Sequence, residues 1–217
     1  MSILEKLNDR QRKAAEKIEG ALLILAGAGS GKTRTITYRI AHMIQELGIS
    51  PYKILAVTFT NKAAKEMKER VEDLVGEDGR RTMVSTFHSF GVRLLRTYGD
   101  RLGYGANFTI YDADDQKRVV KGIMKELVVK DKNLTEGMVV SLISKLKEEE
   151  ISADEYEKSE NKYNMNAVVV AEIYRRYNIT LKNNNGMDFS DILINTAKLL
   201  EIPDILNKVQ DKFRYIM

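Results

Sequence analysis

The chain has 217 residues, of which 43% are hydrophobic and 30% charged, a composition typical of a globular protein that buries a sizeable core. It contains no cysteine and no apolar run near the roughly 18 residues of a membrane span, which excludes disulfides, thiolate metal sites and spanning helices. Residues 1–110 hold 18 Lys and Arg against 12 Asp and Glu, which indicates either a polyanionic partner or a surface with surplus lysines.

The N-terminal third combines a helical entry with a glycine-rich loop. Residues 3–19 predict amphipathic helices, with Asn8 as an N-cap. The unbroken apolar run Ala21–Leu25 then predicts a strand buried on both faces, and the pattern over Gly31–Leu47 predicts a helix. Between them lie three glycines within five residues, followed by Lys32 and Thr33. This is the strand–loop–helix arrangement of a phosphate-binding loop.

The chemistry of such a loop follows from its residue types. Glycines allow backbone N–H groups to turn toward phosphate oxygens, and the helix that follows adds its positive end. We expect Lys32 to reach the β and γ phosphates and the Thr33 hydroxyl to ligate Mg²⁺. The generic pattern has glycine where this chain has Ala26, and the alternative is an ordinary turn with a solvated Lys32.

Two further strands are predicted, the apolar run Lys53–Phe59 and the stretch Thr82–Phe87. A helix should start at Thr60 or Asn61, residues 77–81 should form a loop, and His88 should open another helix. Phe108–Ile110 predicts a short fourth strand. Strands alternating with helices predict a parallel sheet with its ligands at the carboxyl ends of the strands, so Ala26–Thr33, Phe59–Lys62 and Phe87–Ser89 should meet at one rim.

The chain becomes all-helical from Asp112 onward. Helix signals begin at Asp112, at Thr135, at the Ser152–Glu155 capping box and in the stripe over residues 170–181. Asp188 caps another helix, Pro203 begins the last one, and Phe213–Met217 should be extended. We therefore predict three segments: the first part of an ATPase domain over 1–111, an inserted helical subdomain over 112–185, and a return into the ATPase domain over 186–217.

Together these stretches resemble the UvrD/Rep/PcrA family of superfamily 1 DNA helicases through essentially the whole chain. Leu7-Asn8-x-x-Gln11 is similar to the family's Q motif, and the family's phosphate loop also has alanine at its first position. Residues 56–64 resemble motif Ia, and residues 85–89 resemble motif Ib. Asp188–Leu193 resembles the family's Asp-Phe-Asp-Asp-Leu run, with Ser190 in place of one aspartate.

The resemblance implies an incomplete RecA-like P-loop sheet with an inserted helical subdomain, and ATP and Mg²⁺ as cofactors. It implies catalytic roles for Lys32 and Thr33, with Thr33 as the Mg²⁺ ligand. The residues implied to bind the nucleotide are Gln11, which would read the adenine edge, and Ala26, Gly27, Ala28, Gly29, Ser30, Gly31, Lys32, Thr33 and Arg34. Those implied to bind single-stranded DNA are Phe59, Thr60, Asn61, Lys62, Thr86, Phe87 and His88.

Physical chemistry supports the DNA assignment, because Phe59 and Phe87 could stack on bases. The alternative is that both rings belong to the core. The resemblance further implies a cytoplasmic 3′–5′ helicase of DNA repair or replication, acting on single strands and on junctions between single- and double-stranded DNA. Its Asp-Glu motif, which holds Mg²⁺ and orients the attacking water, would follow Met217.

We therefore expect an N-terminal fragment that lacks the C-terminal half of the same protein. It should bind Mg-ATP and DNA weakly, should not hydrolyse ATP or unwind DNA, and should be marginally stable or self-associating. Two alternatives stay open. One is a stand-alone nucleotide- or DNA-binding module without helicase activity, and the other is a small P-loop phosphotransferase.

Overall fold

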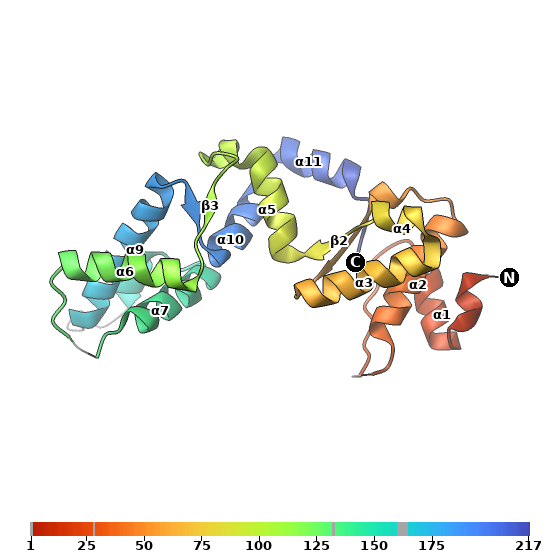
Figure 1. Ribbon diagram of the computed structural model, residues 1–217, viewed down its shortest axis with the longest axis horizontal. Helices are drawn as coiled ribbons and strands as arrows, with labels where there is room; N and C mark the ends of the chain where they lie inside the picture. The colour runs from red at the N-terminus through yellow and green to blue at the C-terminus, as the bar shows by residue number, and fades with distance from the viewer. Residues whose placement is uncertain (1, 28, 132, 160–164) are drawn as a thin grey trace. The chain divides into compact units, whose positions relative to one another are not determined.

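The computed structural model describes residues 2–27, 29–131, 133–159 and 165–217 (Figure 1). It is a helix-rich α/β protein with short parallel strands, as the sequence predicts. Its contacts divide into two compact units: unit 1 comprises Met1–Phe90 and Leu206–Met217, and unit 2 comprises Gly91–Ile205.

Unit 1 contains a three-stranded parallel sheet in the order β2 (Met83–Thr86), β1 (Ile54–Thr58) and β5 (Tyr215–Ile216). The register places Thr58 opposite Thr86, so β1 and β2 end side by side. Buried apolar residues at the start of β1 explain why this run forms the central strand.

Helices surround this sheet. In chain order they are η1 (Ile3–Lys6), α1 (Asp9–Glu16), α2 (Lys32–Gln45), η2 (Pro51–Lys53), α3 (Asn61–Val75), α4 (Glu77–Arg81), the start of α5 (Phe87–Tyr98) and the end of α11 (Pro203–Lys212). The helix α2 packs on both α1 and α3. Ile40 and Met43 of α2, Ile54 of β1, and Met67 and Val71 of α3 form the buried core of this unit.

Two expectations for unit 1 were wrong. Residues Ala21–Leu25 form no strand, and Leu23 and Leu25 are 80% and 86% exposed. An apolar run becomes a strand only where a neighbouring strand completes its backbone hydrogen bonds. Among the described residues, no strand pairs with residues 21–25. The predicted loop over residues 77–81 is the short helix α4, whose first turn is acidic and last turn basic, as the helix dipole favours.

Unit 2 is built on a helical core, with a small sheet at its side. Its elements are the rest of α5, η3 (Gly99–Leu102), β3 (Thr109–Ile110), α6 (Ala113–Glu126), α7 (Glu136–Glu148), α8 (Ala153–Ser159), α9 (Met165–Asn183), β4 (Gly186–Met187), α10 (Phe189–Leu200) and the start of α11. Figure 1 shows α6, α7 and α9 packed together. Val120, Ile143 and Tyr177 lie in the core that these helices share.

The predicted caps and the fourth strand can be compared directly with unit 2. Asp112, Thr135 and Asp188 accept backbone hydrogen bonds as N-caps of α6, α7 and α10, which confirms the predicted helix starts. The strand predicted at Phe108–Ile110 exists as β3, but the expectation that it joins the main sheet was wrong. It pairs instead with β4 in a separate two-stranded sheet, with Thr109 opposite Gly186.

The predicted segment boundaries at 111/112 and 185/186 differ from the contact boundaries at 90/91 and 205/206, because Arg96 of α5 donates to the Ala106 and Phe108 carbonyls and α10 packs on α7 and β4. The three predicted segments therefore stay a prediction. Among the described helices none has the length and apolarity needed to cross a membrane.

Candidate nucleotide and nucleic-acid sites

The glycine-rich loop leads directly into α2. Gly29 and Gly31 have φ of +74° and +86°, backbone conformations that favour glycine. Gly31 is the N-cap of α2 and has no side chain, so no side-chain cap blocks the first-turn N–H groups. An anion can therefore approach the positive end of this helix.

Lys32 lies at the first position of α2, with its ammonium turned back over the loop. Its Nζ donates to the carbonyl oxygens of Ala26 at 2.7 Å and Gly27 at 2.8 Å. Ser30 also closes the loop, because its hydroxyl donates to the Gly27 carbonyl at 2.7 Å. The cation is thus held on the loop by neutral acceptors, which an anionic phosphate can replace with stronger charge-assisted bonds.

Gln11 joins the loop from the N-terminal helix. Its Nε2 donates to the Ser30 carbonyl at 3.1 Å, while its Oε1 accepts from the Asn8 N–H at 3.2 Å. A Cβ on Gly31 would lie 2.7 Å from that Nε2, so only glycine allows this approach. The structure therefore brings Gln11 and the loop together, although they are far apart in the sequence.

The remaining nucleotide-site residues lie on α2 or outside the described residues. Thr33, half-buried, is the second residue of α2. Arg34 donates to the Lys6 carbonyl at 2.8 Å and lies 5.3 Å from the Tyr38 ring centroid. Ala28 lies outside the described residues. In the part of the chain that is described, no group of three His, Asp or Glu side chains could hold a metal by itself.

Phe59 and Phe87 form an exposed aromatic pair at the carboxyl ends of β1 and β2. Their ring centroids are 5.5 Å apart and the planes are tilted by 48°. Phe59 is 88% exposed and Phe87 is 43% exposed, so the alternative that both belong to the core was wrong. The register explains why the two rings meet. Thr58 and Thr86 are paired at the ends of β1 and β2, and each phenylalanine directly follows one of them. Two such rings offer a stacking surface for bases.

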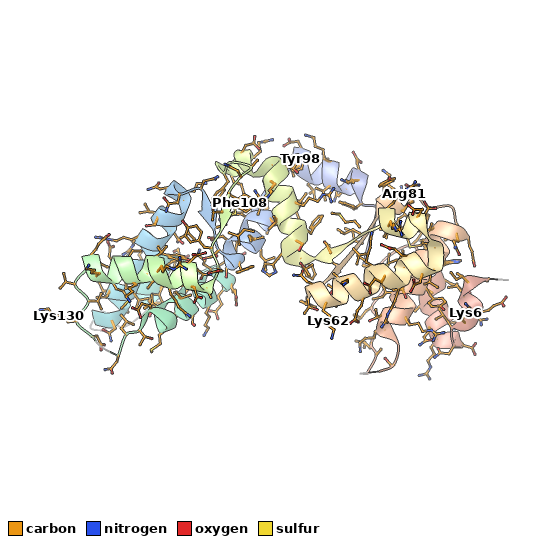
Figure 2. All side chains as sticks on the ribbon, viewed as in Figure 1. Lys6, Lys62, Arg81, Tyr98, Phe108 and Lys130 are labelled. Atoms are coloured by element: carbon orange, nitrogen blue, oxygen red, sulfur yellow. The ribbon has the colours of Figure 1, made fainter. Side chains whose placement is uncertain are left out.

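Polar residues follow the two rings. Thr60 caps α3 through its hydroxyl, which accepts from the Ala63 N–H at 3.1 Å, and Asn61 and Lys62 are exposed in the first turn. Figure 2 shows Lys62 at this end of α3. Thr86 is buried, and its hydroxyl donates to the Ser89 hydroxyl at 2.9 Å. His88 is half-buried in the first turn of α5.

Residues 7–217 match the family model described as the UvrD/REP helicase N-terminal domain. The chain belongs to this family. It is 45% identical to the ATP-dependent DNA helicase PcrA of Staphylococcus epidermidis and 44% identical to that of Staphylococcus aureus, each over 216 residues. These alignments cover 99% of this chain, which spans 29% of the length of these relatives. The resemblance noted in the sequence is thereby confirmed, and the short parallel sheet is that of a partial RecA-like helicase domain.

Unit 2 of this UvrD/REP-type chain contains a buried ionic cluster that sequence reasoning missed. Lys147 of α7 donates to Asp188 at 2.8 Å and to Asp191 at 2.7 Å, and its side chain is 4% exposed. The Tyr177 hydroxyl of α9 donates to the same Asp188 oxygen at 2.9 Å. Burial raises the pKa of Asp191 above its ordinary value, while Lys147 opposes that shift. The cluster therefore links α7 to the start of α10 through ion pairs, and α9 to it through the Tyr177 hydrogen bond.

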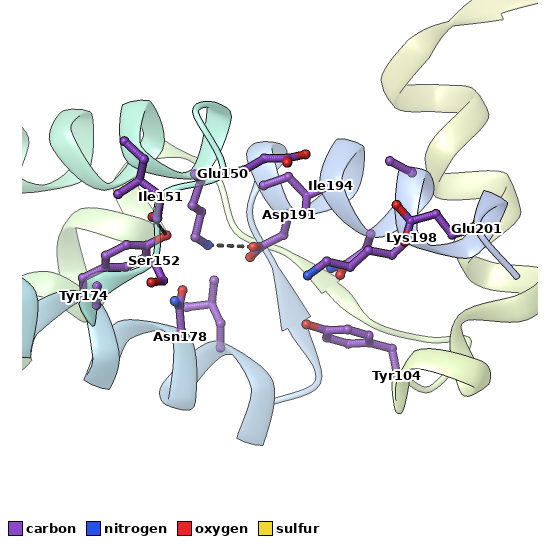
Figure 3. Close-up of a pocket in the computed structure, with 15 residues that line it drawn as sticks. Tyr104, Glu150, Ile151, Ser152, Tyr174, Asn178, Asp191, Ile194, Lys198 and Glu201 are labelled. Carbon is purple, nitrogen blue, oxygen red and sulfur yellow. Dashed lines mark hydrogen bonds and ion pairs between the residues drawn. The ribbon is translucent and has the colours of Figure 1, made fainter. Parts of the chain in front are cut away.

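Lys147 and Asp191 of this cluster line a pocket of about 490 Å³ (Figure 3). Figure 3 shows Tyr104, Tyr174, Asn178 and Lys198 around it, and its dashed line marks the Lys147–Asp191 ion pair. Burial raises the pKa of Tyr174 to about 12, so this phenol stays neutral and its hydroxyl donates to the Ile151 carbonyl at 3.3 Å. The residues that line the pocket belong to unit 2, whereas the loop and the aromatic pair belong to unit 1.

Proposed function

We propose that this chain is the N-terminal portion of an ATP-dependent 3′–5′ DNA helicase and that it binds Mg-ATP and single-stranded DNA. The observation that supports this most is the convergence of Gln11, the loop glycines and Lys32 at the uncapped start of α2. The longer relatives are named ATP-dependent DNA helicases, which supports the helicase part of this proposal.

On the nucleotide side, each residue has a role that its position supports. We propose that the loop N–H groups and the start of α2 bind the phosphates and that Lys32 exchanges its two carbonyl partners for phosphate oxygens. Gln11 would turn its amide from Ser30 to the edge of adenine. Mg²⁺ would neutralise phosphate charge when bound, with Thr33 as its protein ligand.

On the DNA side, we propose that Phe59 and Phe87 stack on bases and that Thr60, Asn61 and Lys62 contact phosphates. The buried Thr86 would act by orienting Ser89 and the start of α5, next to His88. We propose further that the parent acts at junctions of single- and double-stranded DNA in the cytoplasm.

Calorimetric titration of the 217-residue chain with Mg-ATP tests the nucleotide proposal. We expect saturable but weak binding, and phosphate release no faster than from the Lys32→Ala variant. The reason is that these residues include no Asp-Glu pair after an apolar strand to orient the attacking water. Absence of saturable binding would contradict the nucleotide site, and turnover that depends on Lys32 would contradict the proposed inactivity.

A fluorescence titration with oligo(dT) tests the aromatic pair. Phe59→Ala and Phe87→Ala should each weaken binding by about 1–3 kcal/mol, since a stacked base contributes roughly that amount. Tyr52→Ala is the matched control, because Tyr52 is 59% exposed but precedes β1, at the opposite end of the strand from Phe59. If both phenylalanine variants bind as tightly as this control, the stacking role is wrong.

A further inference from the structure

The helix that carries Gln11 has little apolar packing of its own. The helix α1 is 8 residues long and Ala15 is its buried residue. Helices shorter than about 12 residues are marginal in water unless tertiary contacts hold them. Ala15 belongs to a small apolar cluster with Leu4 and Leu7, against which Tyr38 of α2 packs, and polar contacts add to this packing of α1 on α2.

Arg39 of α2 makes those contacts. Its guanidinium donates to the Ala14 carbonyl at 2.8 Å and to the Ile18 carbonyl at 3.2 Å, and the residue is 7% exposed. Ala14 lies in the last turn of α1, where carbonyl groups lack helical partners and a cation is favoured by the helix dipole. Among the described residues, Arg39 Nε has no hydrogen-bond partner, so these two carbonyls are its polar contacts.

Arg39 also belongs to the same rigid element as the phosphate-binding lysine. Both residues lie on α2, two helical turns apart. Gln11 Nε2 donates to the Ser30 carbonyl at 3.1 Å and lies beside Gly31, where a Cβ would be 2.7 Å from that nitrogen. A small displacement of α1 would therefore move the Gln11 amide out of register with the loop.

We propose that Arg39 is a positioning residue for nucleobase recognition: it fastens the end of α1 to α2 and thereby sets Gln11 at a fixed place beside the phosphate-binding loop. This rests on the proposed function, in which Gln11 reads the base. Arg39 itself touches neither base nor phosphate in this account. Its removal should therefore affect base discrimination and leave phosphate binding intact.

The test compares the binding of Mg-ATP, Mg-UTP and inorganic tripolyphosphate to the 217-residue chain. Gln11→Ala should lower the preference for ATP over UTP by about 5- to 30-fold, the loss of two hydrogen bonds to the base. Arg39→Met should lower that preference to a similar extent, and the double variant should lose no more than either single variant. Tripolyphosphate affinity should change less than about 2-fold in all of them, within the scatter of an unaffected surface substitution.

Controls separate positioning from general destabilisation. Arg10→Met removes an exposed arginine from α1, the helix that carries Gln11, and should leave the preference for ATP over UTP unchanged. Arg39→Lys replaces the two-pronged guanidinium with a single ammonium group, so it should retain an intermediate preference for ATP over UTP. Without nucleotide, amide exchange should rise in residues 9–18 of Arg39→Met and stay unchanged in β1 and α3.

The outcomes distinguish the two claims. If Gln11→Ala leaves the ATP preference unchanged, or if the chain binds no nucleotide, the proposed base-reading role fails. If Gln11→Ala lowers the preference and Arg39→Met does not, the positioning role of Arg39 is wrong. Equal loss of tripolyphosphate and ATP affinity in Arg39→Met, or unaltered exchange in residues 9–18, would also overturn it.

Discussion

Replacing Lys32 with alanine should lower the affinity of the chain for Mg-ATP by about 10- to 150-fold, because a hydrogen bond from a charged group contributes roughly 1.5–3 kcal/mol. Lys32 is the cation closest to the loop, and its Nζ already lies on the carbonyls of Ala26 and Gly27. When phosphate replaces these neutral acceptors, the bonds from the ammonium become stronger because both partners are then charged.

The fold of the chain should tolerate this change. Lys32 is exposed, and its contacts are confined to its own loop, so the thermal melt should stay within a few degrees of the parent. Lys17→Ala, which removes an exposed lysine just beyond α1, is the matched control for charge. Mg-ATP affinity that survives Lys32→Ala would mean that the loop is not the nucleotide site.

Replacing Lys147 with methionine should destabilise the chain by about 3–5 kcal/mol, the cost of leaving a buried charge without its partner. Lys147 and Asp188 are 4% and 2% exposed, so water cannot compensate Asp188 once the ammonium is gone. For a chain of this size the midpoint of thermal unfolding should fall by roughly 6–20 °C.

Lys145→Met is the control for Lys147→Met, since it lies on the same helix but is 69% exposed and pairs with Glu149 at 3.8 Å. An exposed pair of this kind contributes at most about 1 kcal/mol. Adding Asp188→Asn and Asp191→Asn to Lys147→Met should recover part of the lost stability, because the buried negative charge is then removed. Equal melting midpoints for Lys147→Met and Lys145→Met would contradict the account of the cluster.

The parts of the fold that were predictable from sequence are those set by local pattern. The run that forms β1 is apolar and pairs with β2, and the caps at Asp112 and Asp188 bond their own helices. Residues 21–25 show the limit of this reasoning. Their pattern is as apolar as that of β1, but strand formation depends on a neighbouring strand that local pattern does not specify.

The candidate nucleotide and DNA residues could be proposed from sequence because recognisable motifs contain them. The buried cations Lys147 and Arg39 were missed because no motif marks them. Lys147 follows Val139 and Ile143 at four-residue steps on the buried face of α7, and Arg39 lies among Ile36, Ile40 and Met43 of α2. A cation within an apolar stripe is the signal that could have revealed both. Their partners could not be inferred, because the carbonyls of α1 and the carboxylates of α10 meet these cations only in the folded chain.

The central claim is that one set of residues in unit 1 binds nucleotide and a second binds single-stranded DNA. Amide NMR spectra of the 217-residue chain, titrated first with Mg-ATP and then with oligo(dT), test it most directly. Mg-ATP should shift signals from Gln11 and residues 27–34, and oligo(dT) should shift signals from residues 59–62 and 86–89. Shifts from Mg-ATP confined to the pocket around Tyr104 and Asn178, or none from oligo(dT) near the aromatic pair, would contradict it.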